Sequence, residues 1–248
     1  MKRFLLWFSV ILIGCCSLSE VHYVDNERSM ITNLKDETVA LMSKEKTQDG
    51  DYGVYCSGVW ISRNLILTAK HCIVSSDSTI TSFNENDMPL DLLNIDIEYT
   101  TRKEVNRDIV RGTAIHSGRT IVIDDFQDLA IIETDVNDTP KHPIARIAQD
   151  DPRDGDDVYI IGHTLGMYWT FLRGYVSATR SPIYDVEGNA TKALQIASPA
   201  YKGNSGGGAF NTNGELVGIC SWVATAVDGM GFFIHKDEVL SLIRKNRR

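Results

Sequence analysis

From about residue 39 onwards, short β-rich runs alternate with turn residues along most of the chain. Val, Ile and aromatic residues fill the runs, and Gly, Asn and Asp stand between them. The runs are SGVWIS, LILTA, RTIVI, LAIIET, DVYIIGH, GYVSATR, ALQIAS, GGAFN, ELVGICSW and GFFIH. Many short apolar runs separated by turns are typical of a β-sandwich or β-barrel. The sequence therefore predicts an all-β fold.

One helix is expected, in the terminal segment DEVLSLIRKN. The apolar residues that can share one helical face there are Val239, Leu240, Leu242 and Ile243. Acidic residues open this segment and basic residues close it, which matches the helix dipole. We therefore predict a helix at the C-terminal end.

The chain begins with a pattern typical of an export leader. Lys2 and Arg3 precede an almost uninterrupted apolar run of 11 residues, Phe4 to Gly14, which is short for a membrane span. We predict a signal peptide over residues 1–14 and a protein that is exported, periplasmic or extracellular. The run ends in LIGC, which resembles a bacterial lipobox. Lipidation at Cys15 would attach the protein to a membrane, and ordinary cleavage between residues 14 and 19 is the alternative.

The remaining chain divides into three parts. Residues 15–38 are polar without an apolar period and are expected to form an N-terminal arm. Residues 39–145 and 146–248 are expected to form an N-terminal β-barrel and a C-terminal β-barrel with the terminal helix. The acidic stretch AQDDPRDGDD, residues 148–157, interrupts the strands. It is either a calcium-binding loop or a solvated connection between the barrels.

The formal net charge is -8, and loss of Lys2 and Arg3 with the leader would make it -10. An acidic chain without a long basic run argues against nucleic-acid binding. The terminal basic residues are expected to be a solvated tail.

Three cysteines lie beyond the leader region. Cys56 and Cys72 flank the strand-like segment SGVWISRNLILTA, and we predict that they form a disulfide in an oxidising compartment. Cys220 lies in an apolar run and is expected to be a buried free thiol.

A serine in a glycine-rich turn is the first candidate for chemistry. Ser205 stands in GNSGGG, residues 203–208, where left-handed backbone angles cost little. The N–H groups of Gly203 and Ser205 can form an oxyanion hole there, with each donor contributing about 3 kcal/mol. A hairpin turn without chemistry is the alternative for this segment alone.

A serine nucleophile needs an imidazole base. His71 follows the run LILTA and should emerge at the end of a strand. Asp128 precedes the buried run LAII and can hold the histidine Nδ1–H. The competing carboxylates are Asp108, Asp124 and Asp125. Zinc binding by His71 and Cys72 is a rival, but no second pair of residues has ligand spacing. No metal and no cofactor are expected.

The order His71, Asp128, Ser205 is the triad order of chymotrypsin-like peptidases, not of subtilisins or α/β-hydrolases. TAKHC resembles the TAAHC box of that family, and DLAII resembles its DIALL-type segment. The runs VYIIGHTLGMYWTFLRGYVSATR, GNSGGGAFNTNGELVGI and GMGFFIH resemble the HtrA-like branch. The resemblance covers residues 40–245 and implies a chymotrypsin-like double six-stranded β-barrel, with the catalytic residues His71, Asp128 and Ser205 in the cleft between the barrels.

The sequence departs from the family pattern in two ways, and each leads to an expectation. Animal trypsins have an aspartate before the serine, whereas this chain has Asn204 and cannot form the ion pair of zymogen activation. The sequence ends soon after the terminal helix, so we expect no PDZ domain to present substrates.

By the same resemblance, Pro199 lies at the base of the primary specificity pocket, and Ser221, Trp222 and Val223 form the substrate-pairing segment. Without a carboxylate at Pro199, a buried cationic side chain would be unpaired. Val223 in place of glycine would narrow the pocket. We expect cleavage after small or medium apolar residues. The alternative is that Trp222 and Val223 are core residues without a role in substrate binding.

The resulting hypothesis is an exported, monomeric serine endopeptidase that acts on polypeptides without a cofactor. The alternative is a catalytically inactive relative, a protein-binding lipoprotein.

Overall fold

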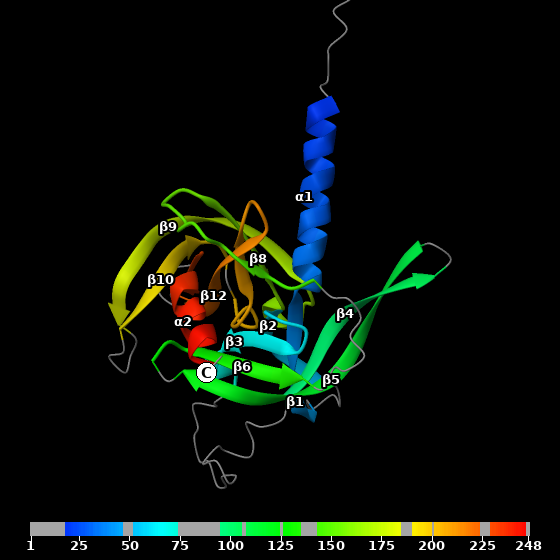
Figure 1. Cartoon of the computed structure of the whole chain (residues 1–248), viewed down its shortest axis with the longest axis horizontal. Coiled ribbons are helices and arrows are strands. Elements are labelled where there is room, and N and C mark those ends of the chain that lie inside the picture. Colours follow the sequence, from blue (N-terminus) through cyan, green and yellow to red (C-terminus); the bar gives the residue numbers. More distant parts are fainter. Residues whose placement is uncertain are drawn as a thin grey trace, which may run out of the picture.

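The structure is a computed structural model that describes residues 18–46, 52–73, 95–105, 108–124, 126–134, 143–184, 190–199, 201–223 and 229–246. The predicted leader, Cys15 and Asp125 lie outside these residues. Two strand-built bodies pack against each other, with a helix before the first and a helix after the second (Figure 1).

The first body is a closed barrel in the order β1-β2-β3-β6-β5-β4. All the strand pairs of this barrel in the described residues are antiparallel. The strands are β1 (Thr38–Lys46), β2 (Tyr52–Trp60), β3 (Leu65–Ala69), β4 (Ile95–Val105), β5 (Asp108–Asp124) and β6 (Leu129–Thr134).

The second body is a sheet in the order β11-β8-β9-β10-β13-β12-β7, closed by an additional pairing of β11 with β12. Within the described residues, six strands form this ring, and β7 lies outside it, parallel to β12. The strands are β7 (Arg146–Ile147), β8 (Asp157–Gly162), β9 (Thr170–Tyr184), β10 (Ala190–Ala197), β11 (Gly208–Asn211), β12 (Glu215–Val223) and β13 (Met230–His235). The helix α2 (Lys236–Asn246) follows. The predicted all-β, chymotrypsin-like double six-stranded barrel with a C-terminal helix is confirmed.

Strand alternation explains how the two barrels join. Along β3 and β6, Ile66 and Ile132 point into the first barrel, whereas Leu67 and Ile131 join a cluster with residues of the second barrel. Successive side chains of a strand lie on opposite faces, so one strand serves both cores. The shared cluster also takes Val239 and Leu242 from α2, which fixes that helix against both bodies.

Within the predicted N-terminal arm, residues Leu18–Asp36 form the helix α1, which the sequence analysis did not predict. Met30 and Leu34 lie one turn apart on the same face and pack on the interbarrel cluster, where Leu34 is buried. The helix is anchored at its C-terminal end, and its N-terminal end projects from the barrels (Figure 1). A single apolar turn was too short to give a periodic sequence pattern. In the described part of the chain, neither helix is long and apolar enough to cross a membrane.

Candidate active site

His71 lies in the short 3-10 turn η1 (Lys70–Cys72), directly after β3. Its neighbour Cys72 is bonded to Cys56 of β2, with a sulfur–sulfur distance of 2.02 Å. The disulfide ties the turn to the wall of the first barrel. The His71 side chain remains 46% exposed and therefore accessible to a substrate.

Asp128 is brought to His71 by strand pairing. The register of β3 with β6 sets Ala69 opposite Leu129, so the residues at these two strand ends are neighbours. The Lys70 N–H donates to the Asp128 backbone oxygen at 3.0 Å, which joins the two ends. Asp128 has φ +50°, a left-handed conformation that aspartate tolerates better than most residues.

The carboxylate of Asp128 accepts hydrogen bonds from the backbone and from the ring of His71. The His71 backbone N–H donates to Oδ1 at 3.0 Å, and ring Nδ1 lies 2.9 Å from Oδ2. The hydroxyl of Ser221, on β12 of the second barrel, also donates to Oδ2. Burial alone would raise the pKa of Asp128, but the hydrogen bonds and the charge of His71 bring it below its ordinary value. The carboxylate is thus held ionised and can fix the ring with Nε2 directed away from it.

The other described carboxylates considered as partners of His71 lie elsewhere in the first barrel. Asp124 ends β5, and its Oδ2 lies 3.3 Å from Nζ of Lys245 on α2. Asp108 begins β5, at the other end of that strand. Among the described carboxylates, only Asp128 contacts His71.

The Ser205 turn lies against the strand that leads to His71. A Cβ built on Gly206 would lie 2.1 Å from the Ser57 backbone oxygen and 3.1 Å from the Ala69 nitrogen. The Gly206 N–H donates to the Cys220 carbonyl at 2.8 Å, next to Ser221. Only a glycine permits this approach, which sets the Ser205 turn against the strand before His71 and against the strand that carries Ser221.

The backbone around Ser205 has two N–H groups without an internal partner. In the described residues, Asn204, Gly206 and Gly207 donate their N–H groups within the protein, whereas Gly203 and Ser205 do not. The Leu165 N–H holds the Lys202 carbonyl at 2.7 Å. Since a trans peptide points its C=O and N–H in opposite directions, the Gly203 N–H faces away from Leu165. The turn therefore offers two donors to an external oxygen.

The hydroxyl of Ser205 and the ring of His71 are not hydrogen-bonded to each other within the described residues. Catalytic hydrogen bonds are often long in a substrate-free enzyme. The structure thus joins His71, Asp128 and Ser221 directly by hydrogen bonds, whereas the Ser205 turn contacts the backbone of the strands that lead to His71 and Ser221.

Each residue that was predicted to bind substrate has different neighbours in the structure. Pro199 is exposed, just after β10. Trp222 stacks on Phe232 of β13 with 5.2 Å between ring centroids, and Val223 pairs with Gly231. Sequence reasoning missed the hydrogen bond from Ser221 to Asp128, because nothing in the run ELVGICSW links it to a residue 93 positions earlier.

Asn204 and Cys220, which directly precede Ser205 and Ser221 in the sequence, are both buried. Asn204 accepts a 2.7 Å hydrogen bond from the Thr164 hydroxyl and is fully buried. Cys220 is free and buried, and burial together with the charge of Asp128 raises its pKa to about 12. A thiol with this pKa is protonated and unreactive at neutral pH.

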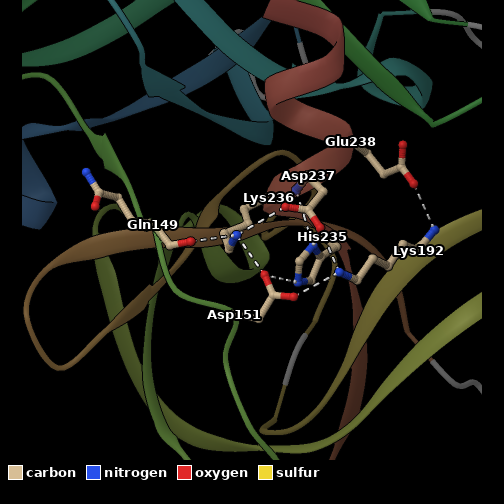
Figure 2. A network of polar contacts seen from close by, with 7 residues as sticks. All are labelled: Gln149, Asp151, Lys192, His235, Lys236, Asp237 and Glu238. Atoms are coloured by element: carbon tan, nitrogen blue, oxygen red, sulfur yellow. Dashed lines mark hydrogen bonds and ion pairs between the residues drawn. The ribbon is translucent and has the colours of Figure 1, made fainter.

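The acidic stretch 148–157 reaches a polar network at the start of α2 (Figure 2). Asp151, His235 and Asp237 are close enough together to hold one metal ion. However, Lys236 contacts Asp151 at 2.7 Å, and Lys192 contacts Asp237 at 2.7 Å. Two ammonium groups beside these carboxylates oppose cation binding, so the geometry favours the solvated connection over the calcium loop.

Comparison with known proteins agrees with this geometry. Residues 56–219 match the family described as trypsin-like peptidase domain. A magnetosome formation protease, MamE of Paramagnetospirillum magneticum, is 32% identical over 135 residues, 51% of this chain and 18% of MamE. An HtrA-like serine protease of Staphylococcus epidermidis is 28% identical over 139 residues, 52% of this chain and 24% of that protein.

Among solved structures, the active form of the Rv3671c protease from M. tuberculosis has a TM-score of 0.64 at 17% identity. That similarity covers 99% of this chain and 93% of the other, and it supports the fold. The matched segments span about a fifth to a quarter of the two curated relatives. The family match extends over most of the chain, which therefore belongs to the trypsin-like peptidase domain family.

Proposed function

We propose that this protein is a serine endopeptidase that cleaves polypeptides by acyl transfer at Ser205. The hydrogen bonds between His71 and Asp128 support this proposal most directly, because they orient an accessible imidazole beside a glycine-rich serine turn. The unpaired N–H groups of Gly203 and Ser205 are the second support, since they suit a developing oxyanion.

In this mechanism Ser205 Oγ attacks the scissile carbonyl carbon while His71 Nε2 removes the hydroxyl proton. The carbonyl oxygen becomes an oxyanion and accepts hydrogen bonds from the Gly203 and Ser205 N–H groups. His71 then gives its proton to the leaving amine, and water hydrolyses the acyl-enzyme by the same route in reverse. Asp128 remains ionised throughout and stabilises the imidazolium, in keeping with its lowered pKa.

A covalent probe tests the nucleophile. A fluorophosphonate should label the leaderless protein, and Ser205→Ala should abolish both labelling and peptide hydrolysis. Ser62→Ala, which removes a hydroxyl in the turn after β2, is the matched control and should keep both. Unchanged hydrolysis in Ser205→Ala would contradict the proposal, and an inactive wild type would favour the protein-binding alternative.

The proposed preference is cleavage after small or medium apolar residues. Pro199 supplies no charge for a Lys or Arg side chain, and the branched side chain of Val223 would restrict the pocket. Profiling with a peptide library tests this preference, and dominant cleavage after Arg or Lys would overturn it.

We propose that the peptidase is active without proteolytic clipping. The position that receives a new N-terminus in trypsins is Asn204 here, and its side chain is buried and bonded to Thr164. The uncut monomer, checked by mass spectrometry and sedimentation, should therefore hydrolyse peptides.

Export and lipid attachment at Cys15 complete the proposal. The motif LIGC after an apolar leader supports them. In a bacterial host, palmitate labelling should be lost in Cys15→Ser and retained in Cys16→Ser, and equal labelling of both variants would place the lipid elsewhere.

A further inference from the structure

Ser57, on β2 of the first barrel, holds two carbonyl groups of the Ser205 turn in the second barrel. Its hydroxyl donates to the Gly203 oxygen at 2.7 Å. Its backbone N–H donates to the Ser205 oxygen at 2.8 Å. The carbonyls of both residues that carry the proposed oxyanion donors are therefore bound by one residue of the other barrel.

The Ser57 hydroxyl is itself held by His163, which follows β8. The His163 backbone N–H donates to Ser57 Oγ at 3.0 Å, and ring Nδ1 lies 3.0 Å from the same oxygen. A hydroxyl has one hydrogen and two lone pairs. Since the hydrogen goes to Gly203, both lone pairs are available to His163, and Nδ1 must carry the ring proton.

The surroundings of His163 fix this arrangement. The ring is fully buried and forms T-shaped contacts with the rings of Tyr168 and Trp169, at centroid distances of 5.7 and 5.4 Å. Burial lowers the pKa of His163 to about 3, so the ring stays neutral and has a single N–H. Nε2 is buried without a hydrogen-bond partner in the described residues, which leaves Nδ1 as the ring's one polar contact.

The glycine at position 203 makes the arrangement possible. Gly203 has φ +95°, and a Cβ there would lie 2.2 Å from the His163 backbone oxygen. His163 therefore packs directly under the turn, and its ring reaches the Gly203 carbonyl only through Ser57. The direction of the Gly203 N–H depends on the adjoining peptides, of which one is tied by Leu165 and the other by Ser57.

We propose that Ser57 and His163 are positioning residues for the oxyanion hole: the His163 ring orients the Ser57 hydroxyl, which fixes the turn and aims the Gly203 N–H. This inference rests on the proposed peptidase function. Neither side chain touches the substrate, so their replacement should alter transition-state binding and leave substrate binding nearly unchanged.

Ser57→Ala tests the first link. Loss of an oxyanion donor costs about 10²–10³-fold in kcat, and we expect loss of its positioning to cost roughly tenfold. The value of KM should change less than twofold, and affinity for a peptidyl trifluoromethyl ketone should fall in parallel with kcat. Thr120→Val is the matched control, because it removes a buried hydroxyl of β5 that has no partner in the described residues. It should leave kcat unchanged.

His163→Asn and His163→Phe test the second link. Asn can present a side-chain N–H to Ser57 and should keep most of the activity. Phe keeps the bulk but removes the ring donor, so it should lower kcat, by no more than Ser57→Ala because the backbone N–H of residue 163 still donates to Ser57 Oγ. The double variant Ser57→Ala, His163→Phe should be no slower than Ser57→Ala alone, since the His163 ring acts only through the Ser57 hydroxyl.

The outcomes separate the two proposals. If the wild type does not hydrolyse peptides, the peptidase function fails. If it does and the folded Ser57→Ala protein retains the wild-type kcat, the positioning role is wrong. Equal loss in His163→Asn and His163→Phe, or a rise in KM without a fall in kcat, would also overturn it.

Discussion

The two barrels contribute to the site in different ways. The first barrel supplies His71 and Asp128 from the ends of β3 and β6, which are neighbours in one antiparallel sheet. The second barrel supplies Ser205 from an irregular turn whose carbonyls are held by Ser57 of the first barrel. The proposed base is thus positioned within one sheet, whereas the proposed nucleophile and oxyanion donors are positioned by contacts across the interface.

The parts of the site from the two barrels also differ in how deeply they are buried. The His71 side chain is 46% exposed, while Gly203, Asn204 and Gly206 are buried. His71 can be replaced with little structural cost, because nearly half of its side chain is exposed and little packing is lost. A change in the buried turn must disturb its neighbours in the other barrel. Substitution of His71 should therefore affect mainly chemistry, and substitutions in the buried Ser205 turn should affect both chemistry and stability.

The largest effect is expected for Asp128→Asn. Loss of the carboxylate that fixes the histidine tautomer lowers kcat by about 10⁴-fold in this type of triad. Unfolding by urea should change far less than activity. Asp124→Asn is the control, since Asp124 contacts Lys245 and not His71. Comparable losses of activity in both variants would argue that Asp128 has no special role.

A smaller but structural effect is expected for Gly206→Ala. Gly155 and Gly206 both have positive φ, +92° and +79°. A Cβ on Gly155 meets nothing within 4 Å, so Gly155→Ala should cost only the strain of about 1–2 kcal/mol. A Cβ on Gly206 would lie 2.1 Å from the Ser57 backbone oxygen, and the cost should exceed about 4 kcal/mol.

Urea unfolding of the two alanine variants measures this difference directly. If Gly206→Ala costs no more than Gly155→Ala, the close contact between the Ser205 turn and the first barrel is wrong, and the nucleophile is positioned within its own barrel.

The smallest effect is expected in the polar network at the start of α2 (Figure 2), where none of the labelled residues belongs to the proposed site. Burial would raise the pKa of Asp237, but hydrogen bonds from Lys192 and Lys236 lower it from 3.8 to about 2. A pKa that is lower in the folded state stabilises the protein above the unfolded pKa, and this contribution is lost as the pH falls towards 2.

Since the Asp237 side chain is 45% exposed, Asp237→Asn should lower the free energy of unfolding by less than about 1 kcal/mol at pH 6. Denaturation curves at pH 6 and pH 2 measure this, and the two proteins should converge at pH 2. Activity should not change. A difference that persists at pH 2 would mean that Asp237 acts through packing instead of charge.

Some parts of the molecule could be predicted because their determinants are local in sequence. Short apolar runs separated by turn residues indicated strands, and the charges of Asp237 and Arg244 marked the ends of α2. The helix α1 was not predicted, because its stability comes from Leu34 docking on a distant cluster and not from a repeating apolar pattern. The contacts of Ser221, Ser57 and His163 were also missed, since each joins residues 93 to 146 positions apart.

The sequence by itself determined the fold class, the terminal helix and the family to which the chain belongs, because periodicity and short motifs depend only on neighbouring residues. Only the tertiary structure decided which aspartate meets His71 and what orients the Gly203 turn. Those choices depend on strand register and on hydrogen bonds between two barrels. Such contacts exist only once the chain has folded, because they join groups whose separation along the sequence carries no local pattern.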